Sequence, residues 1–287
     1  MVSDPTDYKG LPFPTEDGKE AIFLPFGELN SLITATKPTV FFLDDLGQAP
    51  MSVQAACMQL ILARQIDGHK VSDEVVFVAA SNRRQDKAGV LGILEPVKSR
   101  FAAILELEPN TEDWVEWAYA NKMPANLISF IQFKPQFLSE FKPTSDLTNS
   151  PCPRTVAYVG KMINNGVPKD LLYEMVSGAA GNGFATEFKA YLDIYTSIPS
   201  LSELMAKADT LPIPTDPGQL YAYSGFIADN NNSKNIPRLI KFIERMNLEF
   251  QTLVMTQTIK VGGGKNSTVS TTREFLDWSM NHAKTIY

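Results

Sequence analysis

The sequence is poor in the residues that build metal centres and disulfide frameworks. It has two cysteines and two histidines in 287 residues. Cys57 lies in a helical pattern and Cys152 lies between two prolines far along the chain, so we expect no disulfide framework. His69 and His282 have no cysteine pair or HExxH pattern to accompany them, so a zinc site has almost no ligands to draw on.

Long apolar runs and excess positive charge are also missing. No stretch approaches the roughly 20 apolar residues of a membrane-spanning helix, and the opening segment MVSDPTDYKG lacks the basic and apolar regions of a signal peptide. We therefore expect a cytoplasmic protein without a membrane partner. The net charge of -6 argues against broad binding of nucleic acid and favours protein partners or a small anionic ligand.

Apolar runs alternate with amphipathic segments from Lys19 to about Glu108, a pattern typical of an α/β unit with a parallel sheet. Strands are expected at Thr39–Leu43, Glu74–Ser81 and Ala102–Glu108. Between the first two strands, MSVQAACMQLILARQI has apolar residues at helical spacing, which predicts a helix packed on the sheet.

Helical patterns replace the strand signals beyond Pro109. Apolar residues three and four apart occur in TEDWVEWAYANK, PANLISFIQF, PRTVAYVGKMINNG, KDLLYEMVSG and FATEFKAYLDIYTSI. We expect an α/β core over residues 1–108, a helical domain over 109–200 and a helical extension over 201–287.

Two acids follow the first predicted strand in VFFLDD. Asp44 and Asp45 would lie at the carboxyl end of a buried strand, where acids are costly unless they bind a cation or activate water. In ATPases the first acid of such a pair holds hydrated magnesium and the second polarises the attacking water. The alternative is a strand that ends in a solvated turn, and this segment alone leaves both interpretations open.

Two further polar residues follow the next elements. Asn82 comes after the second strand, in the register adjacent to the acids, and could contact the water or a γ-phosphate; as a lone signal, an asparagine at this place is more often a turn former. Arg100 ends a short predicted helix in VKSRF, where its guanidinium could reach the nucleotide of a neighbouring subunit. The alternative is a surface arginine that closes a helix C-terminus.

The order of these motifs resembles the MoxR-type AAA+ ATPases. The matching segments are DPTDYKGLP, VFFLDD, QAACMQLILARQ, AASN, KSRF and SPCPRTVAYV. They cover the chain from its start to about Ser200, and each is weak alone, but they occur in the family's order. The tail after Ser200 carries no motif of the family.

The resemblance implies a partial AAA+ core followed by a helical lid, with ATP and Mg²⁺ as ligands. It implies that Asp44 holds Mg²⁺, Asp45 activates water and Asn82 is sensor 1. Arg100 would be the arginine finger acting on a neighbouring subunit, and Arg154 would be sensor 2. Family members usually form rings that remodel or mature a protein partner, often a von Willebrand factor A-type domain protein.

The chain departs from the family in two places. It has no GxxxxGK[ST] phosphate loop, and VGGGKNST around Lys265 has the wrong spacing and follows a helical segment. DPTDYKGLP resembles the segment after the family's second core strand, so we expect the phosphate loop upstream of Met1, in a separate chain, or lost. The family usually has glutamate at the position of Asp45, and the shorter side chain predicts slow hydrolysis.

Three hypotheses remain at this stage. The first is an AAA+ ATPase subunit that remodels a protein partner. The second is a scaffold that keeps its assembly surfaces but does not hydrolyse ATP. A DNA-remodelling AAA+ protein is the third and is disfavoured, because the sequence shows no helix-turn-helix pattern or basic face. Without the first strand, we also expect the sheet to expose apolar surface on one side.

Overall fold

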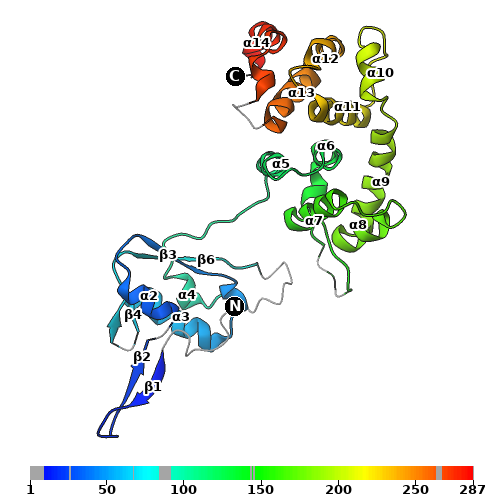
Figure 1. The fold of residues 1–287 in the computed structure, drawn as a ribbon. Helices are drawn as coiled ribbons and strands as arrows, with labels where there is room; N and C mark the ends of the chain where they lie inside the picture. Colours follow the sequence, from blue (N-terminus) through cyan, green and yellow to red (C-terminus); the bar gives the residue numbers. More distant parts are fainter. Residues whose placement is uncertain are drawn as a thin grey trace. The chain divides into compact units, whose positions relative to one another are not determined.

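The structure is a computed structural model that describes residues 10–25, 27–66, 68–83, 92–142, 144, 146–262 and 267–286. Its contacts divide the chain into two compact units, Met1–Glu106 and Leu107–Tyr287, which we call the N-terminal unit and the helical unit (Figure 1). The N-terminal unit combines small sheets with helices, whereas the described elements of the helical unit are all helices. Each unit is considered by itself.

A parallel pair of strands lies along one side of the N-terminal unit, with its helices on one face of the pair (Figure 1). β3 (Thr39–Leu43) pairs with β6 (Val75–Ala79) in a register that sets Phe41 opposite Phe77. Between them in sequence runs α3 (Met51–Ala63), which supplies the crossover that a parallel pair requires. The sequence predicts both strands and this helix, so the α/β class is confirmed at this level.

One face of the parallel pair is covered and the other is bare. Leu43 and Val75 are buried against α2 (Glu28–Thr34), α3 and neighbouring loops in the core of the unit. Side chains alternate between the faces of a strand, and the outward set is apolar as well. These residues, the bare strip, are Val40, Phe42, Val76 and Val78, with exposed fractions of 66%, 55%, 59% and 42%. Parallel sheets are ordinarily covered on both faces, so the strip is the exposed side expected from the sequence.

Two short antiparallel pairs were not predicted. β1 (Leu11–Pro14) and β2 (Ala21–Leu24) form a hairpin, and β4 (Gln65–Ile66) pairs with β5 (His69–Lys70). In the hairpin turn, Gly18 adopts a φ of +66°, a conformation that suits glycine. Strands of two to four residues carry too few alternating positions for the pattern to stand out from the loops around them.

The prediction of a third strand at Ala102–Glu108 is wrong. The segment has no strand conformation, and its apolar side chains are open to solvent: Ile104 is 73% exposed, Leu105 88% and Leu107 96%. A strand needs a hydrogen-bonding neighbour, and within the described part of the chain no strand pairs with this segment. The β pattern in the sequence is therefore present without the partner that would make it a strand.

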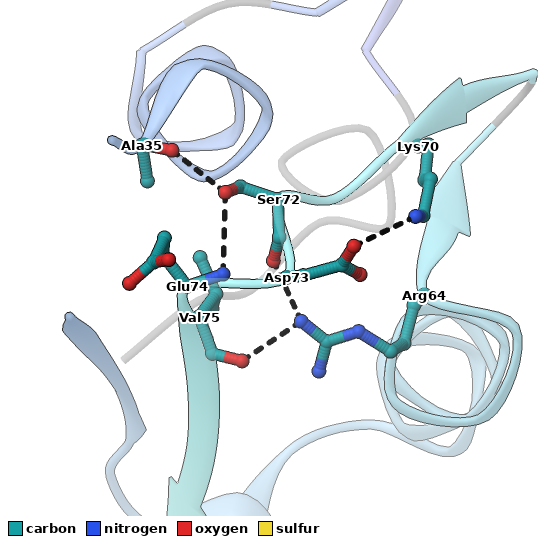
Figure 2. Close-up of polar contacts among 7 residues, drawn as sticks. All are labelled: Ala35, Arg64, Lys70, Ser72, Asp73, Glu74 and Val75. Carbon is teal, nitrogen blue, oxygen red and sulfur yellow. Dashed lines mark hydrogen bonds and ion pairs between the residues drawn. The ribbon is translucent and has the colours of Figure 1, made fainter. Parts of the chain in front are cut away.

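Arg64 ties the start of β6 to the helices beside it, as Figure 2 shows. It ends α3 in the left-handed conformation, and its Nη2 donates to the carbonyl oxygens of Ser72 at 2.6 Å and Val75 at 2.8 Å. The Ser72 hydroxyl in turn donates to the carbonyl of Ala35, just after α2, at 2.6 Å. The guanidinium also lies 5.7 Å from the ring centroid of Phe77. This network fixes where β6 begins.

The first part of the helical unit has an aromatic core. Its helices are α5 (Thr111–Ala120), α6 (Ala125–Phe133), α7 (Pro153–Asn164), α8 (Leu172–Ala180) and α9 (Asn182–Thr196). Phe130 is fully buried at the centre, with the rings of Phe137, Phe184, Phe188 and Tyr191 at centroid distances of 5.2–5.6 Å. Such ring contacts add stabilisation beyond the burial of apolar area.

The second part of the unit has its own core, and one of its helices also packs into the first core. Its helices are α10 (Leu201–Ala206), α11 (Pro217–Asn230), α12 (Ile236–Ile243), α13 (Leu248–Val261) and α14 (Arg273–Ile286). Trp278 is 2% exposed in this core, and its Nε1 donates to Gln251 Oε1 at 2.9 Å. Tyr221 of α11 contacts the ring of Phe133 in the first core and of Phe250 in the second. α11 therefore belongs to both cores.

Candidate functional site

The site begins in the turn that follows β3. The amide of Leu46 donates to the carbonyl of Ala80, and the amide of Ala80 donates to the carbonyl of Leu43, both at 3.0 Å. These two bonds hold the carboxyl end of β3 against the carboxyl end of β6. Asp45 lies between Leu43 and Leu46 and has a φ of +55°. This is a left-handed conformation in which aspartate is enriched among residues other than glycine.

Three polar side chains converge at this edge of the sheet. The carboxylate oxygen Oδ1 of Asp45 faces the side-chain amide of Asn82 at 3.5 Å, the long limit of a hydrogen bond, and the amide of Gln48 at 3.4 Å. The structure thus brings together Asp45 and Asn82, which are 37 positions apart in sequence. Sequence reasoning missed Gln48, whose only signal was its place three residues after an acid in a turn.

The acid pair can accommodate a hydrated magnesium ion. Asp44 is exposed and Asp45 is half-buried with one oxygen facing the two amides. Mg²⁺ is commonly held by one or two carboxylates while its other ligands are waters and phosphate oxygens, and this pair supplies that number. No cluster of three or more histidine, cysteine or acidic side chains occurs in the described residues at a spacing that holds a metal by protein ligands alone.

Arg100 follows a short helix that a buried glutamine anchors. Gln54 is fully buried; its Nε2 donates to the Gly92 carbonyl at 3.0 Å, and its Oε1 accepts from the Leu94 amide at 2.9 Å, just before α4 (Glu95–Lys98). Arg100 Nη1 lies 3.4 Å from Ser99 Oγ, whereas its buried Nε makes no hydrogen bond within the described residues. The helix before Arg100 was predicted, but the strand expected after it is not formed.

The remaining predicted positions are separate from these. Arg154 is exposed in the first turn of α7, in the helical unit, so its placement relative to the acids is not defined. Lys265 in the glycine-rich segment lies outside the described residues, as does most of DPTDYKGLP. Of the predicted positions, the structure therefore brings Asp45 and Asn82 into contact, and the exposed Asp44 directly precedes Asp45.

Comparison of the chain with protein-family models, with curated proteins and with solved structures found no match. Across the helices that the structure describes, none combines the length and apolarity needed to cross a bilayer. What the chain does has to be inferred from its own residues.

Proposed function

We propose that the chain is a MoxR-like AAA+ ATPase subunit that couples ATP binding and hydrolysis to the remodelling of a protein partner. The observation that carries this proposal is the contact between Asn82 and Asp45 at the carboxyl edge of β3 and β6. Ligands of open parallel sheets bind at this edge, and an acid pair beside an amide is the arrangement that positions a metal and a water for phosphoryl transfer.

Each residue then has a role that its surroundings support. Asp44, exposed and adjacent to the edge, would hold Mg²⁺, which supplies charge neutralisation at the phosphates. Asp45 would orient the attacking water, with Asn82 and Gln48 fixing its carboxylate through their amides. Arg100 would act on the site of a neighbouring subunit, and Arg154 would sense the γ-phosphate from the helical unit.

The proposal includes assembly and a partner. A finger residue that acts in trans requires a ring of subunits, and the family resemblance points to a client such as a von Willebrand factor A-type domain protein. The chain contains no GxxxxGK[ST] segment, so nucleotide binding by this chain alone would rest on the Mg²⁺ held by the acids, and we propose that a phosphate loop from another polypeptide segment strengthens it.

The decisive experiment is a titration of the chain with a fluorescent ATP analogue and Mg²⁺. We expect saturable binding that weakens at least ~10-fold in Asp44→Ala, because a carboxylate that contacts the metal contributes more than about 1.4 kcal/mol when charge is neutralised. Asp73→Ala is the matched control, since Asp73 is an exposed acid that pairs with Lys70 before β6, at the opposite end of the strand. Equal affinities for the two variants would contradict the assignment of the site.

A non-hydrolysing scaffold is the second candidate, and the bare strip is the observation that favours it. A sheet with an uncovered apolar face is suited to assembly with another polypeptide, and the sequence lacks a phosphate loop of its own. The same titration separates the two candidates. Absence of nucleotide binding, together with concentration-dependent self-association in sedimentation velocity, would favour the scaffold.

A further inference from the structure

One polar side chain in the core of the N-terminal unit bonds to two loops at once. Gln54, on α3, is fully buried. Its Nε2 donates to the Ala49 carbonyl at 3.1 Å and to the Gly92 carbonyl at 3.0 Å, and its Oε1 accepts from the Leu94 amide at 2.9 Å. These partners fix which end of the side chain carries the nitrogen, because the carbonyls need a donor and the amide needs an acceptor. Both N–H groups and the oxygen of this buried amide therefore have partners.

The first of the two loops is the turn that carries the acids. Within it the Gln48 amide donates to the Asp45 carbonyl at 2.9 Å. The Ala49 amide donates to the Leu46 carbonyl at 3.2 Å. Asp45 therefore begins a hydrogen-bonded turn that ends at Ala49. The Ala49 carbonyl, at the other end of this turn from Asp45, is the group that Gln54 holds.

The second loop leads to Arg100. Leu94 is the N-cap of α4, and the amides of Val97 and Lys98 donate to its carbonyl at 2.9 and 3.0 Å. The Arg100 amide donates in turn to the Val97 carbonyl at 3.0 Å. Val97 is fully buried in the core that α3 also lines, and α4 lies beside α3 (Figure 1). Hydrogen bonds thus connect the Gln54 side chain to the backbone of Arg100.

The arrangement of these bonds favours a role in positioning. A buried amide carries a desolvation cost that an apolar side chain of similar size avoids, and only its hydrogen bonds offset that cost. The groups that Gln54 bonds lie 5, 38 and 40 positions from it in sequence. Because the amide is planar, its N–H and C=O groups point in fixed directions. Both loops can bond to it only while they keep one position relative to each other.

We propose that Gln54 is a positioning residue of the nucleotide site, which couples the turn that carries Asp45 to the segment that carries Arg100. The inference rests on the proposed function, because that function gives the two segments their roles in phosphoryl transfer. Gln54 bonds to backbone groups, so it acts through the placement of other side chains. A ligand that orders the turn holds the Ala49 carbonyl in place, and the shared amide extends this order to the backbone at Leu94.

Hydrogen exchange of the full chain, followed by mass spectrometry, tests this assignment. Gln54→Met keeps the length of the side chain and removes its amide. We expect about tenfold faster exchange in the peptides that cover residues 44–50 and 93–101, because both loops lose hydrogen bonds to the same group. Gln59→Met, at an exposed position of α3, is the matched control and should exchange like the parent.

Two outcomes of this comparison would overturn the assignment. Faster exchange in only one of the two peptides would show that Gln54 anchors a single loop. An equal rise in the exchange of β3 and β6 would show that Gln54 stabilises the unit as a whole and does not position these loops.

A comparison with ligand uses a readout that a purely structural role would not change. With Mg²⁺ and a non-hydrolysable ATP analogue, the parent should exchange about threefold more slowly in both peptides, whereas Gln54→Met should respond only at residues 44–50. Slowing confined to residues 44–50 in the parent would overturn the coupling and leave the nucleotide site intact. Exchange that the ligand changes in neither peptide of the parent would contradict the proposed function, and with it a role for Gln54 at a nucleotide site.

Discussion

The two units bury their aromatic side chains very differently. In the helical unit Phe130 is fully buried and has four aromatic neighbours. In the N-terminal unit Phe42, in the apolar strand β3, is 55% exposed. Both residues lie in segments whose apolar pattern predicts a place in the core. The difference shows that the helical unit gathers aromatic side chains in a closed core, although Phe141 is 53% exposed there, whereas the N-terminal unit leaves one apolar face of β3 and β6 uncovered.

The polar side chains do not divide the units in the same way. In the N-terminal unit the half-buried Arg64 and the buried Gln54 bond to the backbone of loops beside them. Each unit also has buried polar atoms without a hydrogen-bond partner among the described residues, such as Arg100 Nε in the N-terminal unit and Gln257 Oε1 in the helical unit. The contrast between the units therefore lies in their apolar surfaces.

The largest expected effect is at the aromatic centre of the helical unit. Phe130→Ala should lower the free energy of unfolding by about 3–5 kcal/mol, because it removes a buried ring and leaves a cavity. All three tryptophans, Trp114, Trp117 and Trp278, belong to this unit, so tryptophan fluorescence during urea denaturation reports it selectively. Phe42→Ala is the control and should leave this transition unchanged. A comparable loss of unfolding free energy in both variants would contradict the difference in burial between Phe130 and Phe42.

A smaller effect is expected at Arg64. Arg64→Met should destabilise the N-terminal unit by roughly 2 kcal/mol, because two carbonyls in partly buried hydrogen bonds lose a charged donor. Hydrogen exchange of the β6 amides, measured by mass spectrometry, should speed up about 30-fold. Lys70→Met is the matched control, since the Lys70–Asp73 ion pair is exposed and contributes little. Unchanged exchange in Arg64→Met would show that β6 is held by its strand pairing alone.

The smallest effect at neutral pH comes from the tyrosines. Burial raises the pKa of Tyr119, Tyr191 and Tyr195 above the ordinary value of 10.0. The unfolded chain therefore releases protons first as the pH rises above about 10, and the free energy of unfolding falls from there upward. Below that pH the contribution is fully present. Tyrosinate absorbance followed with circular dichroism should show these phenols ionising only as helix is lost, and their ionisation in the folded chain would contradict the burial.

The sequence predicted those elements whose pattern is long and whose partners lie within the chain. β3, β6 and α3 were located correctly because continuous apolar runs and helical spacing are strong signals. Ala102–Glu108 has an equally good strand pattern but no strand beside it. Alternation of apolar residues with a period of two indicates which side chains can lie on the same face of a strand. It does not indicate whether a neighbouring strand exists.

The candidate site was predictable to a similar extent. Asn82 was expected near the acids because the carboxyl ends of parallel strands meet at one edge, and it lies against Asp45. The left-handed backbone of Asp45 and the amide of Gln48 depend on how the turn closes onto Ala80. Such tertiary hydrogen bonds leave no periodic trace in a sequence. The bonds that Gln54 makes to two separate loops were not foreseen either.

Because of the bare strip, the stability of the N-terminal unit depends on the concentration of any molecule that binds this strip. Any molecule that covers Val40, Phe42, Val76 and Val78 binds the folded strands and has nothing equivalent to bind once they unfold. By mass action, such a ligand at 100 times its Kd adds about 2.7 kcal/mol to the free energy of unfolding. Dilution or loss of the partner removes the same amount. A molecule that covers the strip would therefore couple the lifetime of this unit in a cell to its own abundance.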